Sequence, residues 1–168
     1  MAERNILVIG DEQLKKISRP VETIDQRIKD ILEDMVETMR NAPGVGLAAP
    51  QIGVSRRMFV AEPEPGRLYY MINPEILETE GEDIDFEGCL SVPGKLGIVA
   101  RPHKIKMKAQ DITGAWNTYE FEGFDARVML HENDHLDGVI YVERADRVMD
   151  EEELMEEIGQ KEFESDEL

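Results

Sequence analysis

Two histidines four residues apart, with a glutamate directly after the first, are the residues best placed to do chemistry in this chain. They form the run His131-Glu132-Asn133-Asp134-His135. On a helix, side chains at i and i+4 project from the same side, so both imidazoles reach one metal ion. The glutamate then stands beside a metal-bound water and can take its proton. The run therefore predicts a hydrolytic metal site rather than a chance pair of surface histidines.

A catalytic site of this type requires a third protein ligand and an open position for water. The only cysteine of the chain lies in the run Glu87-Gly88-Cys89-Leu90-Ser91, and its thiolate would complete the set. A lone cysteine is more often a small buried hydrophobic residue than a ligand. The neighbouring glycines favour an irregular segment in which the backbone approaches another group closely. The cysteine is thus a candidate ligand, with a packing role as the alternative.

A third run, from Gly44 to Gln51, reads GVGLAAPQ. Its small residues let the backbone pass close to a cleft, and Gln51 offers an amide donor. A nucleotide-binding loop is disfavoured, because no strand leads into the glycines and neither a third glycine nor a Gly-Lys-Ser/Thr sequence follows. The run predicts a segment that passes close to a cleft, although a glutamine taken alone is more often a surface residue.

These runs need elements that hold them together. Apolar residues over 25–40 recur at the spacing of one helical face, which predicts a helix capped by Thr23 or Asp25. The residues after this predicted helix form short segments, and several of these segments alternate between apolar and polar residues, as strands do. The predicted strands are 57–61, 68–73, 75–80, 104–110, 117–121 and 139–142.

A second helix is predicted over 124–136, and it carries both histidines of the metal motif. Asp125 fits the N-cap, and Gly138 fits the position just past the helix end. The sequence shows no internal repeat and no linker that would divide the chain. The sequence therefore predicts an α+β fold, with small, mainly antiparallel sheets packed around a central helix that carries the HExxH motif.

Composition restricts the remaining possibilities. The chain has 168 residues, 41% of them hydrophobic, and a net charge of −18. Residues 150–168 hold ten acidic residues and one lysine, so they carry half of that excess. We expect a catalytic domain over 1–149 and an acidic C-terminal tail over 150–168. No apolar run approaches the roughly 20 residues of a membrane span, and the acidic charge disfavours binding to DNA or RNA. The start of the chain lacks a secretory pattern, which predicts a cytoplasmic location.

Together the three runs resemble, in order and approximate spacing, the three signatures of the peptide deformylase family. The resemblance extends from about Leu7 to Val142. It implies that Cys89, His131 and His135 bind one divalent ion, with water as the fourth ligand. The ion of the family is usually Fe²⁺, while Zn²⁺, Ni²⁺ or Co²⁺ also fit a ligand set of thiolate and imidazole. The implied partner is a nascent polypeptide with an N-formyl-methionyl end, from which the enzyme releases formate.

The resemblance also implies roles for seven further residues. Glu132 acts as general base and then acid, and the Gln51 amide and the Leu90 backbone N–H bind the oxyanion. Val45 and Gly46 are expected to bind the extended peptide as an added strand, and Val128 to line the methionine pocket. Glu87 is placed with these substrate-binding residues and is expected to orient its neighbours.

Other functions remain open at this stage. An ordinary HExxH metallopeptidase needs a downstream third ligand, yet His103 and Cys89 both lie upstream of the motif. A structural metal site normally has four protein ligands. An inactive deformylase relative is suggested by Leu130, where many members have Gln, and by Leu96, where some have Arg. Proximity to the ribosome is possible for a deformylase, but RNA phosphates would repel the acidic tail.

Overall fold

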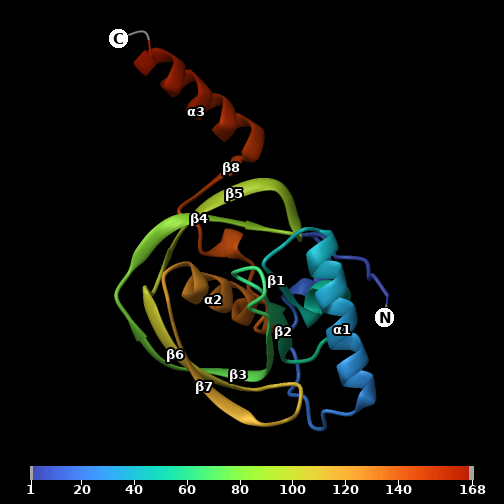
Figure 1. Ribbon diagram of the computed structural model, residues 1–168. Helices are drawn as coiled ribbons and strands as arrows, with labels where there is room; N and C mark the ends of the chain where they lie inside the picture. Colours follow the sequence, from blue (N-terminus) through green and yellow to red (C-terminus); the bar gives the residue numbers. More distant parts are fainter. Residues whose placement is uncertain (1, 167–168) are drawn as a thin grey trace.

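The computed structural model describes residues 2–166, and the side chains of residues 2–158 (Figure 1). The helices are α1 (Gln26–Asn41), α2 (Phe124–Leu136) and α3 (Glu151–Asp166), and the 3-10 turns are η1 (Glu12–Lys15), η2 (Ala49–Ile52) and η3 (Tyr141–Glu143). The strands are β1 (Gly46–Ala48), β2 (Met58–Ala61), β3 (Tyr69–Glu80), β4 (Asp83–Cys89), β5 (Val92–Arg101), β6 (Lys104–Gln110), β7 (Trp116–Glu122) and β8 (Arg147–Asp150).

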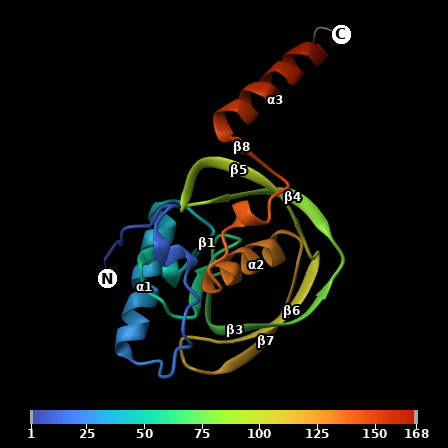
Figure 2. The same ribbon diagram turned by 180° about the vertical axis from the view of Figure 1, so that it is seen from behind.

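The strands form two antiparallel sheets. One has five strands in the order β1-β2-β3-β6-β7, and the other has three in the order β4-β5-β8. Helix α2 lies between the two sheets near the centre of the molecule, and α1 lies at the side next to β1 and β2 (Figures 1 and 2). This arrangement confirms the predicted α+β fold built around the helix that carries the HExxH motif.

Helix α1 forms where its apolar spacing predicts it. The Asp25 carboxylate accepts a hydrogen bond from the Ile28 backbone N–H at 3.0 Å, which satisfies one of the free donors at the helix start. The buried side of the helix packs on β1 and β2. This core contains Leu32, Met35, Met39, Leu47, Met58 and Val60. Because β1 is part of this core, α1 fixes the segment that carries the Gly44–Gln51 run.

Helix α2 begins one residue before the predicted cap. Gly123 occupies the N-cap position with φ 62°, and no side chain caps the helix, so the predicted N-cap at Asp125 is wrong. A glycine suits this entry because it adopts a positive φ without steric cost. At the other end Gly138, with φ 75°, closes the helix as predicted. The apolar side of α2 packs on the five-stranded sheet through Ala126, Val128, Met129 and Leu136.

Three strand predictions need correction. The segments predicted as 68–73 and 75–80 form one strand, β3, with an irregularity at Asn73, whose φ is 51° and whose side-chain amide bonds to Val21. The strand predicted over 139–142 is absent, because this segment ends in the turn η3. Ile140 and Tyr141 are buried from that turn in a small third core, so burial needs no strand here. Strands β1, β4, β5 and β8 were not predicted.

The described part of the predicted acidic tail, residues 150–166, forms the end of β8 and helix α3. Asp150 ends β8, where its backbone pairs with Lys95 of β5 and its carboxylate contacts the lysine side chain. Helix α3 follows directly and projects away from the body of the molecule (Figures 1 and 2). Residues 167–168 of the predicted tail lie outside the described part. Among the described residues, no helix combines the length and the apolar character that crossing a membrane requires.

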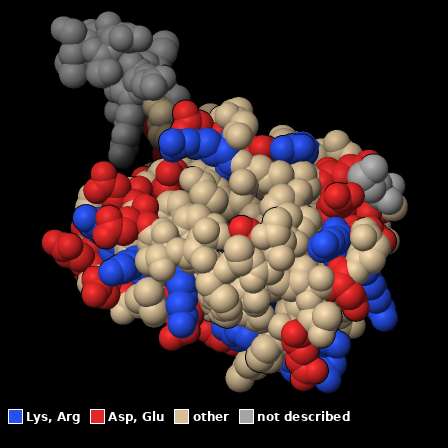
Figure 3. All heavy atoms as spheres, turned by 60° about the horizontal axis from the view of Figure 1, so that its bottom comes forward, with Lys and Arg blue, Asp and Glu red and all other residues tan. Residues whose placement is uncertain are grey.

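Charged side chains lie mainly around the periphery of the face drawn in Figure 3, and its centre is largely uncharged. Lysine and arginine side chains lie among the aspartates and glutamates of that periphery. The acidic excess of the chain therefore does not form one continuous acidic patch on this face.

The close approach of Gly138 to η1 generates a stability prediction. A Cβ on Gly138 would lie 2.6 Å from the Lys15 carbonyl carbon, and its φ of 75° is one that other residues rarely adopt. We expect Gly138→Ala to lower the free energy of unfolding by about 3 kcal/mol or more, because left-handed strain of roughly 1–2 kcal/mol adds to a backbone clash. Urea unfolding followed by circular dichroism measures this loss.

Gly66→Ala is the matched control. Gly66 has a similar φ of 88° but nothing within 4 Å of the added Cβ, so only the strain applies. Equal losses in the two variants would show that the contact with η1 is unimportant.

Candidate metal centre and active site

The structure brings Cys89, His131 and His135 together at the centre of the molecule. One potential ligand atom from each lies within 4.8 Å of the others. Cys89 Sγ is 3.4 Å from His135 Nε2, and the two imidazole rings are 5.2 Å apart and inclined by 70°. This is the spacing expected of groups around one metal ion, since two ligands at roughly 2.0–2.3 Å from an ion lie about 3–4 Å from each other.

Two different elements supply these ligands. His131 and His135 project from one side of α2, one helical turn apart, as their spacing requires. Cys89 ends β4, at a point where the pairing with β5 is irregular between Glu87 and Cys89. Gly88 lies at this irregularity and packs closely on Leu96, since a Cβ there would lie 3.2 Å from the Leu96 side chain. The sheet and the helix therefore meet at the ligand set.

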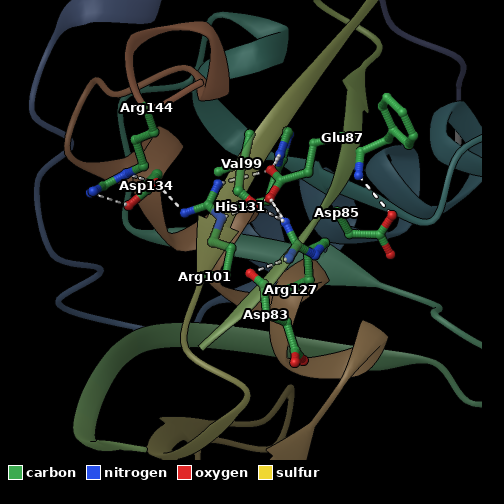
Figure 4. Close-up of polar contacts among 10 residues, drawn as sticks. Asp83, Asp85, Glu87, Val99, Arg101, Arg127, His131, Asp134 and Arg144 are labelled. Carbon is green, nitrogen blue, oxygen red and sulfur yellow. Dashed lines mark hydrogen bonds and ion pairs between the residues drawn. The ribbon is translucent and has the colours of Figure 1, made fainter. Parts of the chain in front are cut away.

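The buried carboxylate of Glu87 holds His131 in place (Figure 4). It accepts a hydrogen bond from His131 Nδ1 at 2.8 Å, two from Arg101 at 2.8 and 2.9 Å, and one from Arg127 at 2.7 Å. Burial alone would raise the pKa of Glu87, but the bonds from Arg101 and His131 lower that pKa well below its ordinary value. Since Nδ1 donates to a permanent carboxylate, Nε2 of His131 is left for a metal ion.

The electrostatic surroundings of the two histidines also suit a cation. Burial, followed by the charges of His131 and Arg101, lowers the pKa of His135 to about 3, so this imidazole is neutral and has a lone pair to donate. For His131, burial opposes protonation, but Cys89, Glu132 and Glu87 raise its pKa well above the ordinary value. The surroundings of His131 thus favour positive charge at this position. The residues present fit a divalent cation bound by one thiolate and two imidazoles.

Glu132 lies beside the ligand set with an unused oxygen. The residue is 4% exposed, and among the described residues its Oε1 has no hydrogen-bond partner. Burial raises the pKa of Glu132 to about 7, while the charge of His131 lowers this pKa and the charge of Glu87 raises it, each by a smaller amount. A Cβ on Gly46 would lie 2.8 Å from the Glu132 Cδ, so any larger residue at this position of β1 would displace the Glu132 carboxyl group. The arrangement places a buried carboxyl group with an unpartnered oxygen next to both the metal ligands and Gly46 of β1.

Gln51 and Leu90 lie next to the cysteine ligand. The Gln51 Oε1 accepts a bond from the Ala48 N–H at 2.9 Å, which fixes the amide in the turn η2. Its Nε2 donates to Ser91 Oγ at 3.0 Å and faces Cys89 Sγ at 3.6 Å. Leu90 directly follows the cysteine. The side-chain amide of Gln51 and the residue after Cys89 therefore border the same space.

A cavity of about 690 Å³ opens over these groups. Its walls come from the segment that leads into β1, from the turn after β4 and from the start of α2. They include Val45, Gly46, Leu90, Val128, His131 and Glu132. Leu96 also lines the cavity, whereas Leu130 packs with the core between α2 and the five-stranded sheet. Of the two departures noted in the sequence, only Leu96 faces the cavity.

The third histidine lies apart from this site. His103 Nδ1 is 2.6 Å from the Asp83 carboxylate, and its side chain is 49% exposed. Within the described residues, the one grouping of His, Cys, Asp or Glu suited to a metal contains Cys89, His131 and His135. His103 is therefore no ligand of the centre.

Several buried residues of the site were not identified from sequence. Arg127 bonds to Glu87, and Arg101 bonds to both Glu87 and Asp134. Arg127 lies four residues before His131, so a cation on the buried side of the predicted helix was the available signal. Nothing in the local sequence distinguishes Arg101 from a surface arginine at a strand end.

Tyr141 is a further residue missed from sequence. Its ring stacks on the His131 imidazole at 5.9 Å and 26°. Gly97 makes room for this ring, because a Cβ there would lie 2.7 Å from it. Burial, followed by the charges of Cys89 and Glu87, raises the pKa of Tyr141 to about 12. The ring therefore packs on His131 as a neutral phenol.

Comparison with known proteins points to one family. The family model for polypeptide deformylase matches residues 3–151. The peptide deformylase of Acetivibrio thermocellus is 49% identical over 154 residues, which cover 92% of this chain and 90% of that protein. The crystal structure of the Thermotoga maritima peptide deformylase has a TM-score of 0.85 and 41% identity, and the match covers 88% of this chain and 100% of that one.

A structure of the Acinetobacter baumannii peptide deformylase bound to Met-Ala-Ser is also similar. Its TM-score is 0.81 at 35% identity, and the match covers 84% of this chain and 98% of that chain. The family model, the related sequences and the similar crystal structures all indicate peptide deformylase, which agrees with the Cys/His/His centre between α2 and β4. The chain belongs to the peptide deformylase family.

Proposed function

We propose that this peptide deformylase uses one metal ion, held by Cys89, His131 and His135, to hydrolyse the N-formyl group of formyl-methionyl polypeptides. Formate and a free amino terminus are the products. The observation that carries the proposal is the convergence of one thiolate and two imidazoles beside Glu132, whose Oε1 has no partner in the described part of the chain. A structural metal site would need a fourth protein ligand rather than a free carboxylate.

The ion bound in this site is proposed to be Fe²⁺, as the family resemblance implies. Zn²⁺, Ni²⁺ and Co²⁺ also suit one sulfur and two nitrogen ligands. A divalent ion supplies Lewis-acid chemistry, because it polarises a carbonyl oxygen and lowers the pKa of water.

Glu132 acts as the general base and then as the general acid. Its Oε1 is free to accept the proton of the attacking water as that water adds to the formyl carbon. The same carboxyl then donates a proton to the leaving amine nitrogen. Its pKa of about 7 in the buried site suits both directions of proton transfer near neutral pH.

Gln51 and Leu90 stabilise the developing oxyanion. The Gln51 amide is fixed by the Ala48 N–H through its oxygen, so its nitrogen points toward the ligand set at low entropic cost. The backbone N–H of Leu90 supplies the second donor. Donors that are in place before reaction need no reorganisation when charge appears.

The peptide is proposed to bind along the segment Val45–Gly46. Strand β1 is at the edge of the five-stranded sheet, so its outer side is open to an added strand. Main-chain pairing explains how one site accepts many sequences after the first residue. Val128 lines the part of the cavity offered to the methionine side chain, and Glu87 contributes indirectly by orienting His131. The bound Met-Ala-Ser in the Acinetobacter baumannii deformylase supports a peptide ligand of this size.

The proposed setting is the cytoplasm of a cell that begins proteins with formyl-methionine. Nascent chains bring the enzyme near ribosomes. Helix α3 begins with Glu151, Glu152 and Glu153, and this charge makes α3 an unsuitable anchor on ribosomal RNA.

The first prediction concerns the general base. Wild-type protein loaded with Fe²⁺ or Ni²⁺ should release formate from formyl-Met-Ala-Ser, and Glu132→Gln should lose activity by about 10²–10⁴-fold. Because Glu132 is not a ligand, metal content measured by mass spectrometry should stay at that of the wild type. Unchanged formate release in the variant would exclude Glu132 as the base.

The second prediction concerns the contact between β1 and the base. Gly46→Ala places a methyl group against the Glu132 carboxyl group, so kcat should fall by about 10–100-fold as the carboxyl group moves. Gly44→Ala is the control, since its Cβ meets only the flexible end of Leu90 at 2.8 Å. Similar kcat values for both variants would contradict the proposed geometry.

The third prediction concerns the metal. Removing the ion with a chelator should abolish formate release, and anaerobic reloading with Fe²⁺ should restore it. Air should inactivate the Fe²⁺ form faster than the Ni²⁺ form, since a thiolate beside ferrous iron is open to oxidation. Full activity of the chelated protein would rule out a metal-dependent reaction.

A further inference from the structure

Arg144 connects the C-terminal segment to helix α2. It directly follows the turn η3 and precedes β8. Its guanidinium donates to both oxygens of Asp134, with Nε–Oδ2 at 2.6 Å and Nη2–Oδ1 at 3.1 Å. The Arg144 side chain is 49% exposed, whereas that of Asp134 is 12% exposed. A bidentate pair of this kind fixes the rotation of the carboxylate as well as its position.

Asp134 links Arg144 to the buried Arg101 (Figure 4). Its Oδ2 also accepts a bond from Arg101 Nη1 at 2.7 Å. The other two guanidinium nitrogens of Arg101 each bond to one oxygen of Glu87. Glu87 in turn holds His131 Nδ1. A continuous series of charged hydrogen bonds thus runs from the surface to a metal ligand.

The buried bonds of Arg101 and Glu87 depend on Arg144 at the surface. Arg101 is 4% exposed. Its guanidinium group is held between two carboxylates, those of Glu87 and Asp134. Without Arg144, the Asp134 Oδ1 loses the partner that the structure gives it, and the carboxylate is free to turn. Arg101 then loses a fixed acceptor, and its bonds to Glu87 lose their alignment. Arg127 still supports Glu87, so the effect on His131 is partial.

We propose that Arg144 is a positioning residue for the metal ligand His131, acting through Asp134, Arg101 and Glu87. This inference rests on the Cys/His/His metal site of the proposed function. It adds that the segment after the HExxH helix is part of the apparatus that holds the metal. Partners behind a metal ligand typically change metal affinity by about 10–100-fold. A more distant residue belongs at the lower end of that range.

The chain offers a closely matched control pair. Arg40 donates to both oxygens of Glu62 at 3.1 and 2.8 Å, and the side chains are 52% and 14% exposed. The pair of Arg40 and Glu62 therefore matches the pair of Arg144 and Asp134 in residue type, hydrogen-bond geometry and exposure. The control pair joins the end of α1 to the segment after β2 and has no bond to the metal ligands. Exposed ion pairs of this type contribute little to stability.

The test compares Arg144→Gln with Arg40→Gln in the full chain. Each protein is loaded with Co²⁺, and metal release to excess chelator is followed by the visible absorption of the Co²⁺ centre. We expect release to be about 10-fold faster in Arg144→Gln and unchanged in Arg40→Gln. The Co²⁺ spectrum should also shift in Arg144→Gln alone, because it reports the orientation of the ligands. Arg144→Lys restores one of the two bonds and should give an intermediate rate.

The outcomes separate this inference from the proposed function. If wild-type protein binds no Co²⁺ at the site, the proposed function fails. If wild-type protein binds Co²⁺ and the two glutamine variants release it at equal rates with equal spectra, the role of Arg144 is refuted. Urea unfolding of both variants is run in parallel, and a matching small loss of stability shows that faster release is specific to the metal site.

Discussion

The buried carboxylate of Glu87 is the interaction on which the site depends. It joins β4 to β5 through Arg101 and to α2 through Arg127 and His131. A buried charge is costly unless it is paired and hydrogen-bonded. Glu87 meets that condition only when the three-stranded sheet and α2 are docked correctly. The same bonds that make the packing specific leave His131 with one nitrogen for metal binding.

The two sheets make different kinds of contact with helix α2. The five-stranded sheet and α1 build the larger apolar cores and present β1 at the edge of the cavity. The three-stranded sheet meets α2 through charged bonds, in which Arg101 bonds to Asp134 and Glu87 accepts bonds from Arg127 and His131. This division lets one side of α2 stay apolar, while the other carries His131, Glu132, Asp134 and His135. The helix is thus a structural core element and the carrier of the reactive groups.

The sequence predicted those features whose causes are local. The periodicity of α1 and the spacing of His131 and His135 require only a helix, and both predictions were confirmed. Strands β4 and β5 were missed because their glycines and charges weaken the alternation, and their partners lie in other segments. Arg101 and Asp134 become functional only through tertiary contacts. The segment 139–142 forms no strand: it leads into the turn η3, from which Tyr141 stacks on His131, a tertiary contact that the local sequence does not reveal.

X-ray absorption on the Zn²⁺-loaded protein tests the central claim most directly, because it reads the atoms bound to the metal. The docking of β4 on α2 through Glu87 should give one sulfur neighbour at about 2.3 Å and nitrogen or oxygen neighbours at about 2.0–2.1 Å. The Cys89→Ser variant should lose the sulfur neighbour and keep the imidazole signal. A wild-type spectrum without sulfur, or with more than one sulfur per metal, would contradict the account.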